Sequence, residues 1–253
     1  MIALQSIVMA FSCFTAIPMP QVEWDDKNMR HLMAAFPLVG ALIGGAVWLW
    51  WLACDAVGFG GLVRSAGLTL IPLILTGGIH MDGFSDVTDA QSSHASPERK
   101  RQILKDPHTG AFATMGVCAY LIAYMALASE LSVRMVPALA CVPVVSRCVC
   151  AYMAVTWQAA SPKGMFATIH EAASSRVVCV TAALALVAAG VVMIARGPLG
   201  GVIALGTALV LAAWLKHFSA REFGGMSGDL LGFYVQSSEL AMLAALVVAG
   251  RVA

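Results

Sequence analysis

The segment LMAAFPLVGALIGGAVWLWWLA (residues 32–53) decides the fold class, because it carries no charged side chain over its whole length. About 20 consecutive apolar residues, at about 1.5 Å of rise each, cross the hydrocarbon core of a bilayer as a helix. Within it, Gly40 and Gly44 form a G-x-x-x-G pattern, which lets a second helix approach closely. The segment therefore predicts a transmembrane helix inside a bundle.

Similar apolar runs recur along the chain. Of its 253 residues, 60% are apolar and 11% are charged, whereas a soluble domain carries about 25% charged residues. We expect six further spans, at approximately 62–79, 111–128, 135–155, 177–195, 199–215 and 240–250. The sequence thus predicts an all-α, polytopic membrane bundle of about six to eight transmembrane helices. We expect one domain over residues 1–253, embedded in the lipid bilayer.

Charge and cysteine content exclude several other classes. The net charge is +1, and no basic run alternates with aromatic residues, so we expect no nucleic-acid partner. The seven cysteines form no C-x-x-C pair and read as small buried hydrophobes rather than a zinc site. Residues 1–20 are apolar without a preceding Lys or Arg, which indicates a retained helix rather than a signal peptide. Formation of a homo-oligomer is left open.

Lysine and arginine counts predict the orientation. Ten fall on the side that holds the long polar loops, four on the other, and Arg147 lies within a span. The ten are Lys27, Arg30, Arg99, Lys100, Arg101, Lys105, Lys163, Arg176, Lys216 and Arg221. Because positive residues favour the cytoplasmic side, we expect this end to face the cytoplasm across the inner membrane. Long loops on one face indicate an enzyme rather than a symmetric conduit.

The most distinctive polar segment is GGIHMDGFSDVTDA (residues 77–90). In a helix, Asp82, Asp86 and Asp89 have i,i+4 and i,i+3 spacing and project from one face, where like charges repel. A hard cation would offset that repulsion, and Mg²⁺ prefers such oxygen ligands. An acidic first turn at a helix N-terminus would account for Asp82 alone. His80, two residues earlier, is a candidate to bind phosphate or to orient a carboxylate.

Two further polar segments and one buried charge complete the candidate site. In ERKRQILKDPHTG (residues 98–110), the first basic residues suit a membrane edge, while Lys105 is a candidate phosphate partner and Asp106 a metal or base carboxylate. In REFGGMSGDLLG (residues 221–232), glycines before a helix favour backbone approach to phosphate. The substrate candidates there are Gly225, Ser227 and Gly228, and Asp229 adds a carboxylate. Arg147 is costly at span depth, which indicates a phosphate or aspartate partner.

These segments together resemble the cobalamin (5′-phosphate) synthase family. Residues 77–89 match its G-G-x-H-x-D-G-x-x-D-x-x-D signature, and the matching segments run in order over nearly the whole chain. They include residues 14–20, 36–40, Lys105-Asp106, Arg147 and 224–229. The chain departs from the family pattern at Ala16, Ala90 and Ser227.

The resemblance implies a Mg²⁺-dependent transferase acting on adenosylcobinamide-GDP and α-ribazole or its 5′-phosphate. A hydroxyl of the riboside would attack the phosphorus attached to cobinamide, and GMP would leave. Asp82, Asp86 and Asp89 would hold Mg²⁺ on the pyrophosphate, with Lys105 and Arg147 as phosphate partners. Either Asp89 or Asp229 would take the hydroxyl proton.

Two alternatives compete with this interpretation. A CDP-alcohol phosphotransferase also uses clustered aspartates, but its D-x-x-D-G-x-x-A-R pattern is not matched around Asp82 and Gly83. A cation transporter would need acidic residues near mid-span and access from both sides. Here the aspartates lie at the end of an expected span, on the face with the long loops.

Overall fold

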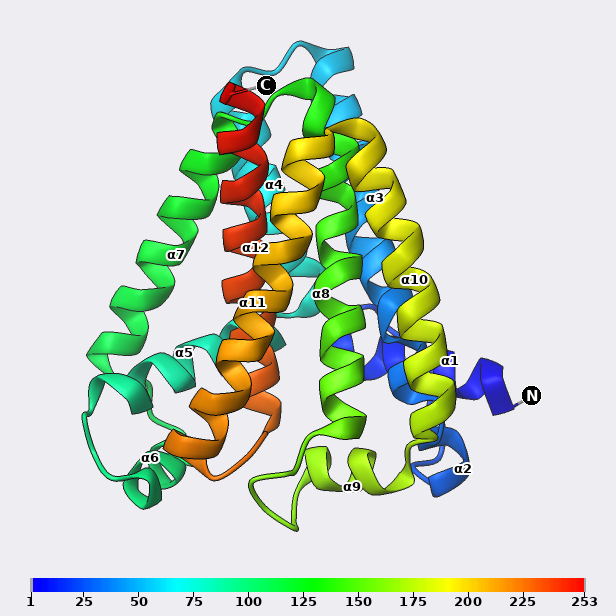
Figure 1. Cartoon of the computed structure of the whole chain (residues 1–253), viewed down its shortest axis with the longest axis vertical. Helices are drawn as coiled ribbons and strands as arrows, with labels where there is room; N and C mark the ends of the chain where they lie inside the picture. The colour runs from blue at the N-terminus through cyan, green and yellow to red at the C-terminus, as the bar shows by residue number, and fades with distance from the viewer. Residues whose placement is uncertain (1, 253) are drawn as a thin grey trace.

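The computed structural model describes residues 2–252, and within that range every named element is a helix (Figure 1). This confirms the all-α expectation. In chain order the elements are α1 (Ile2–Phe14), α2 (Asp26–Met29), α3 (Leu32–Val57), α4 (Gly61–Thr76), α5 (Ile79–Ser92), α6 (Pro97–Ile103), α7 (Ala111–Ser129), η1 (Val133–Met135), α8 (Val136–Thr156), α9 (Met165–Ala172), α10 (Ser175–Arg196), α11 (Pro198–Phe223) and α12 (Gly228–Val252).

Six long helices form a polytopic bundle. Within the described range, α3, α7, α8 together with η1, α10, α11 and α12 are long and apolar enough to cross a membrane. They run along one direction, and the short helices α2, α6 and α9 gather at one end (Figure 1). We call this the loop-rich end. The opposite end has short connections.

Helix α8 lies at the centre and packs against α3, α10, α11 and α12. Its contact with α3 depends on the G-x-x-x-G pair. A Cβ added to Gly40 would collide with the carbonyl of Pro143, and one added to Gly44 with the carbonyl of Ala140. Glycine at both positions therefore lets the two backbones touch, as the pattern predicted.

The expected second span is broken. Helix α4 has 16 residues and is about 24 Å long, which is shorter than the hydrocarbon core of about 30 Å. Gly77 and Gly78 then take positive φ angles of 61° and 81°, which glycine adopts without a Cβ penalty. The chain turns by 96° into α5. Helix α5 runs crosswise to the six long helices (Figure 1) and packs against α7 and α12.

The last two spans are longer than hydropathy indicated. Helix α11 continues to Phe223, and α12 begins at Gly228 rather than near residue 240. Polar residues such as Lys216 and Glu239 reduce the average hydropathy without ending a helix. Helix α1 packs against α3. Two residues after its end, Ala16 N donates a hydrogen bond to Leu75 O at 2.8 Å. The N-terminal helix is thus packed on the bundle.

Candidate active site

Helix α5 carries the acidic motif at the loop-rich end. The segment is helical, so the condition under which its three aspartates share one face is met. Met81, Gly83 and Val87 are buried against the bundle, while Asp82 is exposed and Asp86 is partly exposed. The three aspartates thus lie along one stripe of the helix, with buried residues on both sides of it.

A close crossing with α12 brings a fourth aspartate to this helix. A Cβ on Gly83 would lie 2.7 Å from Asp229 O, and one on Gly232 would lie 2.9 Å from His80 O. Such approaches leave no room for a side chain, so glycine is required on both helices. The crossing places Asp229, in the first turn of α12, beside the N-terminal half of α5.

The carboxylates are close enough to affect one another. Burial first, and then the negative charges of Asp82, Asp229 and Asp89, raise the pKa of Asp86 to about 6. Each neighbour disfavours a second negative charge, as expected for carboxylates that share a site. A divalent cation would remove this repulsion.

Asp89 occupies the other end of α5. A Cβ on Gly110 would collide with the Asp89 carboxylate, so this side chain lies against the residue that precedes α7. A negative charge is favoured at a helix N-terminus. Asp82 and Asp229, in contrast, line a cavity at the other end of α5.

The donor set fits a magnesium ion. In residues 2–252 no three acidic, histidine or cysteine side chains already surround a single point. Mg²⁺ needs less than that, since one or two carboxylates with water and phosphate oxygens satisfy its octahedral shell. Asp82 and Asp86 lie one helical turn apart, and their negative charges repel each other. They therefore provide such a pair.

The glycine-rich loop before α12 is held by a second loop. Met226 N donates to Gln158 O at 2.9 Å, and Ala160 N donates to Met226 O at 2.8 Å. Gly225, with φ 144°, touches the same segment, and an added Cβ would lie 2.8 Å from Gln158 O. This glycine serves loop–loop contact in the structure, and its predicted role toward substrate stays a prediction.

Ser227 is placed by the start of α12. Its Oγ accepts a hydrogen bond from Leu230 N at 3.3 Å and lies 3.4 Å from an Asp229 carboxylate oxygen. A serine in this position caps the helix and satisfies one of its free amides. Gly228, the next residue, lines the cavity with Asp229. Of the predicted substrate residues in this loop, Ser227 therefore caps a helix and Gly228 forms part of the cavity wall.

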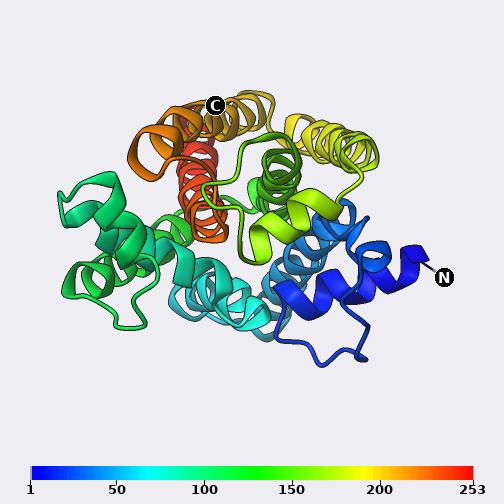
Figure 2. The ribbon, with the colours of Figure 1, turned by 90° about the horizontal axis from the view of Figure 1, so that it is seen from below.

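The cavity has a volume of about 200 Å³. Its wall is mainly apolar and is built from α1, α3, α8 and α9 together with the first turns of α5 and α12. The apolar contributors include Phe14, Met33, Phe36, Ala154, Phe166 and Ile169. Helix α9 lies across this end of the bundle (Figure 2). Phe14 and Phe36 belong to segments 14–20 and 36–40 of the resemblance, but no pattern in the sequence marked any of these residues as part of a cavity.

His80 is the one histidine in the cavity wall of the described chain. The residue is 5% exposed, and its ring packs beside those of Phe14 and Phe36, with centroid distances of 6.2 and 5.8 Å. Within residues 2–252 its buried Nδ1 has no hydrogen-bond partner. Burial, assisted by the positive charge of Arg147, lowers its pKa well below the usual value.

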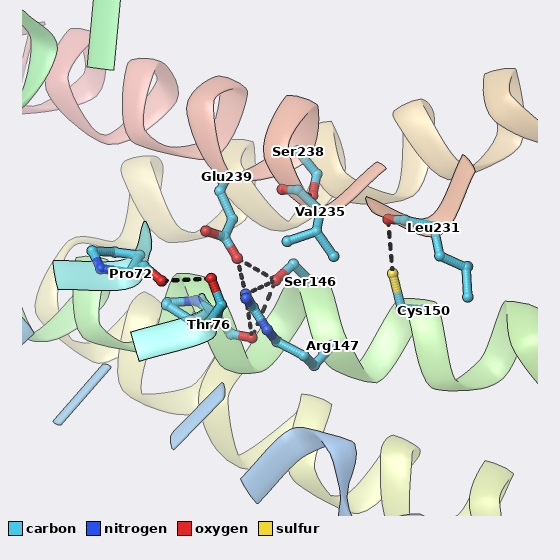
Figure 3. A network of polar contacts seen from close by, with 10 residues as sticks. Pro72, Thr76, Ser146, Arg147, Cys150, Leu231, Val235, Ser238 and Glu239 are labelled. Atoms are coloured by element: carbon cyan, nitrogen blue, oxygen red, sulfur yellow. Dashed lines mark hydrogen bonds and ion pairs between the residues drawn. The ribbon is translucent and has the colours of Figure 1, made fainter. Parts of the chain in front are cut away.

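Arg147 lies deeper in the bundle, where it pairs with Glu239 of α12 (Figure 3). Its Nη1 also donates to Ser146 Oγ at 2.9 Å, and that hydroxyl lies 2.7 Å from Glu239 Oε1. Its guanidinium carbon lies 6.0 Å from the Phe36 ring centroid, behind the cavity wall. The ion-pair partner is therefore a glutamate rather than one of the aspartates expected from the sequence.

Lys105 and Asp106 are exposed on the loop between α6 and α7. The His108 ring Nδ1, at 2.7 Å, and the His108 backbone N–H, at 3.0 Å, hydrogen-bond the Asp106 carboxylate and lower its pKa. This loop ends at Gly110, where Asp89 lies. Lys105 is thus placed toward the Asp89 end of α5.

The neighbouring basic residues have a structural part that the membrane-edge interpretation missed. Lys100 is 3% exposed and pairs with Glu222 at the end of α11. Its Nζ also donates to Gln91 Oε1 at 2.9 Å. The pair fixes α6 between α5 and α11, and so holds the loop that carries Lys105.

Sequence comparisons with known proteins all point to one family. The sequence model of a family described as cobalamin-5-phosphate synthase matches residues 6–247. A protein of Lachnoclostridium phytofermentans named adenosylcobinamide-GDP ribazoletransferase is 37% identical over 97% of this chain and 94% of its own length. Proteins of the same name from Clostridium botulinum and Geobacillus kaustophilus are 33% and 32% identical, over 94% and 93% of this chain and 95% and 92% of theirs. No solved structure matches the chain.

Proposed function

Because the chain belongs to the cobalamin-5-phosphate synthase family and is a transferase of cobalamin biosynthesis, we propose that it joins α-ribazole, or its 5′-phosphate, to adenosylcobinamide-GDP and releases GMP. The observation that carries the proposal for this site is the α5–α12 crossing. It sets Asp82, Asp86 and Asp229 together beside a cavity. A site with clustered carboxylates and an adjoining cavity suits a reaction between a pyrophosphate and a neutral hydroxyl.

In the proposed reaction, a ribose hydroxyl forms a new P–O bond at the phosphorus attached to cobinamide. The bond from that phosphorus to the bridging oxygen breaks, and GMP leaves with that oxygen. Asp229 takes the hydroxyl proton as general base. Its position in the cavity wall supports this assignment, whereas Asp89 lies against Gly110.

Asp82 and Asp86 would hold Mg²⁺, and Asp89, about 4.5 Å beyond Asp86 along the helix axis, would hold the same ion or a second one. When bound, the metal supplies a Lewis acid that neutralises charge on the pyrophosphate oxygens. Lys105 would contact the phosphates of the nucleotide at the Asp89 end. Its exposure, and the Lys100–Glu222 pair that holds its loop, support this placement.

We place the enzyme in the cell inner membrane with the loop-rich end toward the cytoplasm. The six long apolar helices support a multi-pass arrangement. The excess of lysine and arginine at the loop-rich end supports the orientation. Both substrates carry polar groups, so a site at a membrane surface receives them from water.

The proposal is tested by Asp82→Asn and Asp86→Asn in purified, detergent-solubilised protein. Each change keeps the side-chain shape and removes a ligand charge, so Mg²⁺-dependent GMP release should fall by at least ~10²-fold. Calorimetry with Mg²⁺ alone should show weaker binding in both variants.

Asp55→Asn is the matched control. Asp55 is an exposed carboxylate near the end of α3, where the connections are short. Its replacement should leave both Mg²⁺ binding and turnover unchanged. Wild-type GMP release by Asp82→Asn or Asp86→Asn would contradict the metal assignment.

A further inference from the structure

The cavity beside Asp82 and Asp229 is larger and more apolar than a metal site requires. An apolar cavity of ~150 Å³ accommodates a benzene ring, and this one measures about 200 Å³. Its volume therefore suits a fused pair of aromatic rings with small substituents. Three phenylalanines in its wall offer aromatic faces and edges to such a ring.

The substrates of the proposed reaction differ in the chemistry of their rings. The base of α-ribazole is a benzimidazole with two methyl groups, and once attached to ribose it keeps one ring nitrogen as an acceptor. Guanine carries an amino group, a carbonyl and several polar nitrogens around its edge, each of which needs a partner when buried. The corrin ring is far larger than the cavity.

The polar groups of the wall match the first of these rings. Apart from the carboxylates of Asp82 and Asp229, the only polar side chain lining the described cavity is His80. The His80 ring lines this wall, and an imidazole can present one N–H donor. One donor and one acceptor suffice for a dimethylbenzimidazole. Guanine would need acceptors for its N1–H and its amino group, and the acceptor side chains of the described wall are Asp82 and Asp229, which the proposed function assigns to the metal and to the attacking hydroxyl.

We propose that this cavity, with Phe14, Phe36 and Phe166 in its wall and His80 as its hydrogen-bond donor, is the binding site for the methylated benzimidazole base of the acceptor riboside. The assignment rests on the proposed function. With its base in the cavity, the riboside directs its ribose toward Asp229 and the α5 carboxylates. The guanosine diphosphate portion then lies along α5 toward Lys105.

The inference is tested with His80→Phe, which keeps a ring of similar size and removes the donor. Loss of one buried hydrogen bond should raise the Kd of α-ribazole about tenfold in calorimetry. The KM for α-ribazole in GMP release should rise by the same factor, while the KM for adenosylcobinamide-GDP stays within about twofold. His217→Phe, at an exposed position on α11, should change none of these values.

A change of substrate gives a second test, and its first comparison needs only the wild-type protein. The wild-type protein should bind the dimethylbenzimidazole riboside at least about tenfold more tightly than the hypoxanthine riboside, because the polar edge of a purine lacks partners here. A riboside of dimethylindole, which has no acceptor nitrogen, should bind wild type and His80→Phe equally well.

The outcomes separate this inference from the proposed function. GMP release that is normal in wild type, with His80→Phe changing only the KM for adenosylcobinamide-GDP, would overturn the base site and leave the reaction standing. Competition for this cavity by guanosine would overturn it as well. Binding of α-ribazole that depends on His80, in a protein that never releases GMP, would support the base site and contradict the reaction.

Discussion

At the scale of single residues, the buried ion pair of Arg147 and Glu239 bears on whether Arg147 contacts substrate or only supports the cavity wall. Both side chains are at most 3% exposed, and the Arg147 guanidinium lies behind Phe36 of the cavity wall. We therefore expect it to position the wall rather than to bind phosphate. Arg147→Met or Glu239→Gln alone should each destabilise the protein by ~3–5 kcal/mol, because one partner is left buried without its counter-charge.

The double variant Arg147→Met/Glu239→Leu discriminates between the two roles of Arg147. Removing both charges should recover most of the thermal stability in detergent, and GMP release within about tenfold of wild type. A double variant that is stable yet inactive would restore the direct contact with substrate that the sequence suggested. The KM for adenosylcobinamide-GDP, measured alongside, reports which step is lost.

The same residues show what a sequence conveys about a site. The cost of an arginine at span depth was visible in the sequence, and so was the need for a partner. Its identity was not, because Glu239 lies on another helix and only folding brings it to α8. Phe14 and Phe36 lie in segments that match the family pattern, but the place of these two and of Phe166 in a cavity wall could not be predicted, since apolar residues are ordinary in every span of this chain.

At the scale of elements, the turn between α4 and α5 places the acidic motif. Gly77 has φ 61° and is the C-cap of α4, and Gly58 has φ 78° and is the C-cap of α3. An alanine at either position should cost ~1–2 kcal/mol through the same left-handed strain. Gly77→Ala should also displace α5 and lower GMP release, whereas Gly58→Ala should lower only the unfolding temperature.

Thermal unfolding and GMP release measured on both variants check this expectation. Equal loss of turnover in the two would mean that the turn has no special part in the site. The aspartate spacing indicated only that a helix here would place its carboxylates on one face, and it predicted neither the bounds of α5 nor the 96° change of direction. Two adjacent glycines are compatible with a helix end or with a flexible link, and tertiary packing of α5 on α12 selects the sharp turn.

At the scale of the whole molecule, hydropathy predicted the bundle because the bilayer demands it. Backbone groups inside hydrocarbon must be paired within the segment, so long apolar stretches become helices. Hydropathy did not predict the helical segments that are polar, because backbone pairing is not enforced by hydrocarbon there. These segments are the polar ends of α11 and α12 and the whole of α5. Those are the segments that build the site, because carboxylates, lysines and glycines are needed there for chemistry and for close approach.

The predicted orientation follows from the excess of lysine and arginine at the loop-rich end and can be tested directly. Gly60 is exposed at the end with short connections, and Lys163 is exposed on the loop between α8 and α9 at the loop-rich end. Exposed thiols in water react with maleimides as thiolates. In intact cells, a membrane-impermeant maleimide should label Gly60→Cys, and it should label Lys163→Cys only after the inner membrane is permeabilised. The unsubstituted chain corrects for its seven native cysteines. Labelling of Lys163→Cys in intact cells would reverse the orientation and put the carboxylates of α5 on the side opposite to the nucleotide pool.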